Sequence, residues 1–148
     1  MKEGLTVVKE RFDHEEQTGR YSGKILFMLS DGEPTDAPVD VVAGIAEMLR
    51  KSNVMLVSCY VTDEDITEPR KLYGKTENDS PKGARLMFDC ASELPPNSPF
   101  ESYLSEYNWT VAQGARLFTQ INQSEALSEF LNLLLSPVNR QGRILATR

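Results

Sequence analysis

The residues best suited to chemistry lie in one short stretch, Ser30-Asp31-Gly32-Glu33-Pro34-Thr35-Asp36. A continuous apolar run ends directly before it, so that an aspartate stands where a buried strand would end. In open α/β sheets, ligands bind at the carboxyl ends of the strands. Mg²⁺ is held there by one or two carboxylates and keeps several waters. Asp31 is therefore a candidate Mg²⁺ ligand, and a Mg²⁺-dependent hydrolase or phosphotransferase that uses Asp31 and Asp36 is one hypothesis for the stretch.

Other catalytic residues are scarce in this sequence. No Gly-rich phosphate loop occurs, and there is no Gly-x-Ser-x-Gly elbow or Asp-x-Asp ahead of the glycine. The single histidine, His14, lies in the charged run Asp13-His14-Glu15-Glu16, which is typical of a solvated helix face. With no nucleophile and base in a recognisable pattern, the sequence favours a non-enzymatic protein.

The acidic stretch follows the first of two long apolar runs, residues 24–30 and 54–61. Continuous rather than alternating hydrophobicity predicts strands that are covered on both faces, as in a parallel sheet. Between them, Val41, Val42, Ile45, Met48 and Leu49 form one broad helix face, so strand, helix and strand make a βαβ unit. The predicted fold is α/β: a Rossmann-like three-layer sandwich with a mostly parallel sheet flanked by helices.

Further elements complete this prediction. They are a first helix over residues 2–17, a surface excursion over 62–83, short helices over 85–93 and 100–106, a third strand over 115–120, and a last helix that begins at Asn122. We expect Thr35 or Asp36 to cap the second helix, and Asn122 with Glu125 to form a capping box for the last one. The domain is expected to span residues 1–138, followed by a tail over 139–148.

Composition excludes several classes of partner. The chain has 148 residues and a formal net charge of −6, which argues against binding to nucleic acid or to an anionic membrane surface. No apolar stretch approaches the roughly 18 residues of a membrane span. The absence of a signal-peptide pattern favours an intracellular location. Cys59 and Cys90 both lie in apolar surroundings, and either buried thiols or a disulfide would suit them.

The apolar run 24–30 with its Asp-Gly ending closely resembles the fourth strand and following loop of von Willebrand factor type A (vWA) domains. In that family this aspartate belongs to the metal-ion-dependent adhesion site, where it binds the metal directly or through water, and Asp31 matches it. The similarity extends to residues 1–17 as the preceding helix, 54–61 as the fifth strand, and 115–135 as the last strand and helix. The resemblance implies the C-terminal half of a vWA domain.

One departure from the family pattern is large. The main metal motif of vWA domains, Asp-x-Ser-x-Ser, does not occur in these 148 residues. The family's metal-site threonine precedes the first helix, whereas Thr6 is expected to lie within it. Asp31 would therefore belong to an incomplete site, with Mg²⁺ bound weakly or not at all in this chain alone. A different βαβ domain with an acidic turn is the alternative.

The resemblance implies a protein-interaction module, with Gly32, Glu33 and Thr35 expected to contact the partner beside the 62–83 excursion. In the family the strand that 24–30 matches is central, so without its neighbour it would expose an edge that pairs with other strands. We expect self-association through Lys24, Ile25, Leu26, Phe27 and Met28, most simply as an antiparallel homodimer. Pairing with a chain that supplies the missing strands is the alternative. A truncated fragment without autonomous function is a third hypothesis, because Met1 opens directly into a helix.

Overall fold

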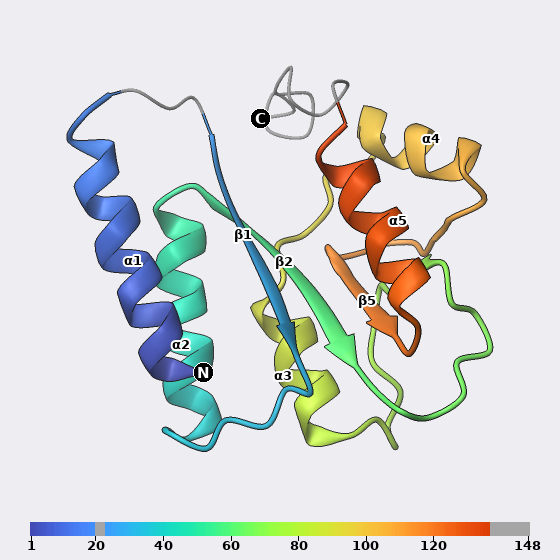
Figure 1. The fold of residues 1–148 in the computed structure, drawn as a ribbon, viewed down its shortest axis with the longest axis horizontal. Coiled ribbons are helices and arrows are strands. Elements are labelled where there is room, and N and C mark those ends of the chain that lie inside the picture. Colours follow the sequence, from blue (N-terminus) through green and yellow to red (C-terminus); the bar gives the residue numbers. More distant parts are fainter. Residues whose placement is uncertain (20–22, 137–148) are drawn as a thin grey trace.

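The two apolar runs form the two long strands of a parallel sheet in the computed structural model, which describes residues 1–19 and 23–136 (Figure 1). Strand β1 (Lys24–Ser30) pairs in parallel with β2 (Val54–Val61), and β2 pairs in parallel with β5 (Phe118–Ile121). The strand order is β1-β2-β5, so β1 is an outer strand. The predicted α/β class with a parallel, helix-flanked sheet is confirmed.

The helices cover the sheet from both sides and make three layers (Figure 1). The described residues form five helices: α1 (Lys2–Glu16), α2 (Val39–Lys51), α3 (Lys82–Cys90), α4 (Pro99–Glu106) and α5 (Ser124–Leu134). Helices α2 and α3 pack on one face of β2, with α1 against α2, whereas α5 packs beside β5 on the other face. Two very short strands, β3 (Lys71–Leu72) and β4 (Thr110–Val111), form a separate parallel pair.

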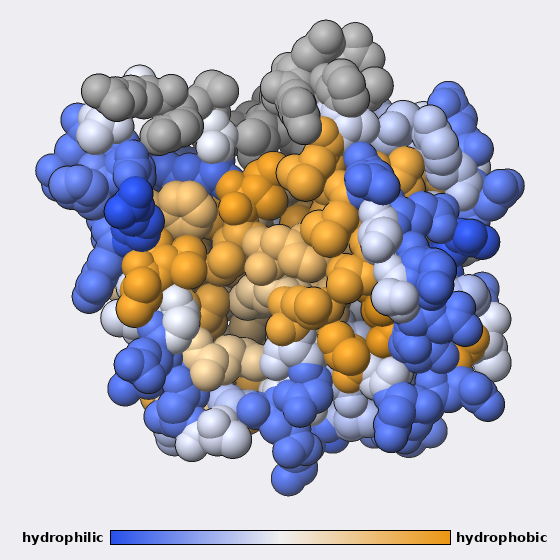
Figure 2. Space-filling view, in the orientation of Figure 1, coloured by the Kyte–Doolittle hydropathy of each residue, from blue (hydrophilic) through white to orange (hydrophobic). Residues whose placement is uncertain are grey.

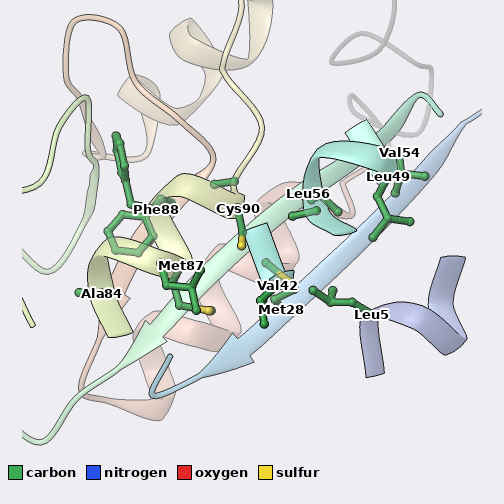
Figure 3. Packing of buried hydrophobic residues seen from close by; sticks show 14 residues of the cluster. Leu5, Met28, Val42, Leu49, Val54, Leu56, Ala84, Met87, Phe88 and Cys90 are labelled. Carbon is green, nitrogen blue, oxygen red and sulfur yellow. The ribbon is translucent and has the colours of Figure 1, made fainter. Parts of the chain in front are cut away.

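A first hydrophobic cluster fills the space between the sheet and helices α1, α2 and α3 (Figure 3). Met28 of β1 and Leu56 of β2 point into it, and Leu5 of α1 approaches Met28 from the outer side. Burial of each large apolar side chain contributes about 1.5–3 kcal/mol. Leu26 and Met28 of β1 both belong to this cluster, because every second side chain of a strand points to the same face.

A second cluster lies on the α5 face of the sheet. Phe130 of α5 stacks on Trp109 with ring centroids 4.8 Å apart, and the ring of Phe27 lies 6.4 Å from that of Phe130. Val57 and Cys59 of β2 are buried here as well. The odd-numbered residues of β1 therefore lie on the same face of the sheet as α5, and Phe27 contacts it.

The two long strands have the predicted boundaries, and the later elements deviate. The third strand begins at Phe118 rather than at residue 115, α3 begins at Lys82, and the 62–83 excursion contains β3. The predicted capping box is wrong: Gln123 is the N-cap of α5, and the Asn122 side chain donates to the Glu64 carbonyl oxygen at 3.0 Å. The end of the predicted domain and its tail lie outside the described residues.

Both cysteines are buried free thiols, so no disulfide joins them. Burial raises the pKa of Cys59 well above its ordinary value and raises that of Cys90 to about 11. These thiols therefore act as small core side chains.

Candidate functional site

The carboxyl ends of β1 and β2 bring two acidic loops together. Ser30 and Tyr60 are partners in the parallel register, so the loop that begins at Asp31 lies beside the loop that follows Val61. The second loop carries three consecutive acidic residues, at positions 63–65, and all three are exposed. This end of the sheet is therefore strongly negative.

The Asp31-Gly32 turn is explained by packing. The backbone N–H of Gly32 donates to the Ser30 hydroxyl at 3.0 Å, and the N–H of Glu33 donates to the Asp31 carboxylate at 3.3 Å. Gly32 has a φ of 78°, and a Cβ there would lie 2.2 Å from the backbone oxygen of Gly83 in α3. Only glycine fits this position without strain. Gly32 is buried, whereas Glu33 and Thr35 are exposed.

Asp36 has a structural partner that the sequence did not indicate. Its carboxylate accepts hydrogen bonds from the backbone N–H groups of Lys2 and Glu3 at 3.0 and 2.8 Å, and from the Met1 amine at 3.0 Å. These donors hold the pKa of Asp36 well below its ordinary value. The predicted capping of α2 by Thr35 or Asp36 is wrong: the N-cap of α2 is Pro38, without a side-chain bond, and Asp36 holds the start of α1 instead.

The acidic loops act together on one neutral side chain. The pKa of Tyr60 is raised, first by burial and then by the carboxylates of Glu64, Asp31, Glu33 and Asp63. Within residues 1–19 and 23–136, however, no group of three or more acidic, histidine or cysteine side chains is arranged to hold a metal ion. Thr6, as expected, lies inside α1, where its hydroxyl donates to the Lys2 carbonyl oxygen. Asp31 is therefore not part of such a group in the described ranges.

The second feature of interest is the outer edge of β1. No described strand pairs with that edge, so its outward backbone groups have no sheet partner in the described part of the chain. The Lys24 ammonium lies 3.1 Å from the Glu16 carboxylate and ties the start of β1 to α1. Of the other residues predicted for self-association, Leu26 and Met28 pack in the cluster with α1 and α2. Phe27 lies on the opposite face against Phe130 of α5, and Ile25 is exposed.

Beside this edge lies an apolar surface that sequence analysis missed. Helix α5 sits over β5 and leaves the α5 face of β1 open, where Ile25 is 40% and Leu29 is 50% exposed. Figure 2 shows apolar side chains spread across the middle of this face. We call the set Ile25, Phe27, Leu29, Met55 and Val61 the β1 strip. Its signal in the sequence is the apolar residue at every second position of β1. No local pattern indicates that the helices of the described ranges leave Ile25 and Leu29 uncovered.

None of the helices within the described ranges has both the length and the apolar character needed to cross a lipid bilayer. Comparisons with models of known protein families, with curated proteins and with solved structures find no match for this chain. The described fold itself places the chain in the α/β class, with a parallel three-stranded sheet.

Proposed function

We propose that the chain is a non-enzymatic protein-interaction module of the vWA type, with an incomplete metal-ion-dependent adhesion site, which self-associates through β1. The observation that carries this proposal is the outer edge of a long apolar strand, with which no strand of the described residues pairs. Such an edge presents a row of backbone donors and acceptors that templates pairing with another strand. The simplest arrangement pairs two copies of β1 antiparallel about a twofold axis.

The acidic loops support a binding role more than a catalytic one. The carboxylate of Asp36 accepts hydrogen bonds from the start of α1, so it is not free to act together with Asp31. Glu33 and Thr35 stand exposed beside Asp31 and are available to a partner. A partner chain that supplies further strands and oxygen ligands could complete a Mg²⁺ site around Asp31, which a magnesium titration of such a complex would detect.

The test of self-association is the mass of the purified chain in solution. We expect sedimentation velocity to give an even oligomer, with the same mass in the presence and absence of Mg²⁺. Hydrogen exchange on the same samples should show added protection of β1 amides as the protein concentration rises, because pairing satisfies the outward N–H groups. A monodisperse monomer at every concentration up to about 100 μM, that is, no dimer tighter than about −5 kcal/mol, contradicts the proposal.

A matched pair of variants locates the contact. Leu29 on β1 and Met48 on α2 are 50% and 51% exposed, so a lysine at either position costs little packing. Lysine on an edge strand opposes strand pairing, so L29K should weaken the dimer, whereas M48K should not. Equal weakening by both variants would place the interface elsewhere.

A further inference from the structure

The β1 strip is bounded on one side by a helix and on the other by an open edge. The ring of Phe27 contacts Phe130 of α5, which marks the limit of the surface that α5 covers. Beyond that limit Ile25 and Leu29 stand half in solvent, and Val61 of β2 is 41% exposed. Contiguous exposed apolar surface of this kind marks an interaction site.

The dimensions of the strip suit a helix. β1 has seven residues, so the strip is about 23 Å long at roughly 3.3 Å per residue. A helix of about 15 residues has that length. In layered α/β folds the surface of a sheet is covered by helices that pack along the strands, as α2, α3 and α5 do in this chain.

The two ends of the strip differ in charge. At the carboxyl end of the strands the carboxylates of Asp31, Glu33 and residues 63–65 form no ion pair with any lysine or arginine of the described chain. At the amino end the carboxylates are neutralised, because Glu16 pairs with Lys24 and Glu15 pairs with Arg11. The electrostatic potential is therefore negative at the carboxyl end of the strip and close to neutral at its amino end.

This asymmetry defines how a helix would lie. The N-terminus of a helix carries a partial positive charge and its C-terminus a partial negative charge. A helix on the strip is most stable with its first turn at the acidic end, running antiparallel to β1. Basic residues in that first turn would meet the unpaired carboxylates.

We propose that the β1 strip binds an amphipathic helix of a partner protein, about four turns long, whose basic N-terminal turn lies at the Asp31 loop. This inference deepens the proposed interaction function and rests on it. None of the five described helices is free to take this place, because each already packs within the fold of this chain. The occupant we propose is therefore a helix of another protein. Antiparallel pairing of two β1 strands about a twofold axis perpendicular to the sheet leaves both strips open on one side, so helix binding and self-association are compatible.

The experiment uses two synthetic 15-residue peptides with the same leucine face and composition. One peptide carries lysines in its first turn and glutamates in its last turn, and the other reverses them. An (i, i+4) lactam on the solvent face fixes both as helices, and a fluorophore at the C-terminus reports binding by anisotropy. The lysine-first peptide should bind at least about tenfold more tightly, and high salt should reduce the difference.

Two protein variants and one control locate the contact. I25S and L29S should each weaken binding about fivefold or more, because each removes apolar surface from the strip. M48S, at matched exposure on α2, should bind as the wild type does. Either serine variant suffices if the other does not fold, as judged by circular dichroism.

Several results would overturn the inference. These are no saturable binding by the lysine-first peptide, equal binding of the two peptides, or equal weakening by M48S. Sedimentation of the same samples separates this inference from the proposed function. A monomer that binds the lysine-first peptide refutes self-association alone, and a dimer that binds neither peptide refutes helix binding alone.

Discussion

Replacement of Gly32 by alanine tests whether the turn after β1 is fixed by packing. The new Cβ would stand 2.2 Å from the Gly83 backbone oxygen and 2.4 Å from its carbonyl carbon, both in the first turn of α3. Backbone atoms of a helix cannot move away as a flexible side chain can. The φ of 78° adds a conformational cost, since residues with a Cβ rarely adopt it.

The two costs can be estimated separately. The left-handed backbone costs an alanine about 1 kcal/mol, and overpacking against rigid neighbours costs about 1–3 kcal/mol. G32A should therefore lower the free energy of unfolding by about 3 kcal/mol. For a domain of this size, that corresponds to a fall in Tm of about 6–12 °C. Urea denaturation followed by circular dichroism measures the loss directly.

Three other glycines supply matched controls. Gly114 has a φ of 67° and nothing would lie within 4 Å of a Cβ added there, so G114A carries the conformational cost alone, about 1 kcal/mol. A Cβ at Gly83 meets the Asp31 backbone oxygen at 2.3 Å without a positive φ, so G83A carries the packing cost alone. Gly44 in α2 has neither, and G44A should stabilise the protein by about 0.5–1 kcal/mol. If G32A costs no more than G114A, the close approach of this turn to α3 is refuted.

Three further predictions concern charge, thiols and buried hydroxyls. The N–H donors lower the pKa of Asp36, so the ionised carboxylate stabilises the fold above the unfolded-state pKa, and this stabilisation is lost as the pH falls. Below about pH 5, the urea midpoint should therefore fall less steeply in D36A than in the wild type. Cys59 and Cys90 are buried with raised pKa values, so a chromogenic disulfide reagent at pH 8 should react with neither until the chain unfolds. The hydroxyls of Ser58 and Thr119 are buried without a hydrogen-bond partner among the described residues, so S58A and T119V should each raise the free energy of unfolding by about 1 kcal/mol.

Each of these predictions has a control. The control for D36A is D79A, an alanine at an exposed aspartate of the 62–83 excursion, measured over the same pH range. Protein unfolded in urea should release two equivalents of chromophore at once, and a fast equivalent from native protein would show that one thiol is accessible. Loss of stability in both S58A and T119V would mean that the two hydroxyls have partners, such as ordered water.

The pattern of apolar runs and turn residues along the sequence was sufficient to predict the two long strands and the fold class. Residues 24–30 and 54–61 are apolar throughout and are bounded by strong turn signals, so their ends coincide with β1 and β2. The third strand begins three residues later than predicted, because the apolar Ala115 and Leu117 precede it and resemble an extension of the strand. Leu117 is buried beside the sheet without belonging to β5, and this distinction depends on hydrogen bonding rather than on hydrophobicity.

The caps show why local rules fail where distant segments meet. Asp36 precedes α2 and has the residue type of an N-cap, yet its carboxylate accepts from N–H groups more than 30 positions away. Asn122 and Glu125 have the spacing of a capping box, yet the Asn122 amide binds the carbonyl oxygen of Glu64. In both cases the side chain binds a segment that is distant in sequence instead of capping the adjacent helix. Local sequence patterns cannot predict that such a segment lies within hydrogen-bonding distance.

The β1 strip also bears on the function. Continuous hydrophobicity in β1 predicts burial on both faces. The structure covers the face that carries Leu26 and Met28, whereas on the other face only Phe27 is covered by a described helix. Ile25 and Leu29 have no covering element in the described part of the chain, and Leu29 is half exposed. Apolar residues at these positions gain nothing from solvent exposure, and burial of each would contribute about 1.5–3 kcal/mol. The outer edge of β1 lies next to the β1 strip. A strand paired with the edge and a helix packed on the strip, from one partner or from two, would bury the apolar residues on both faces of β1.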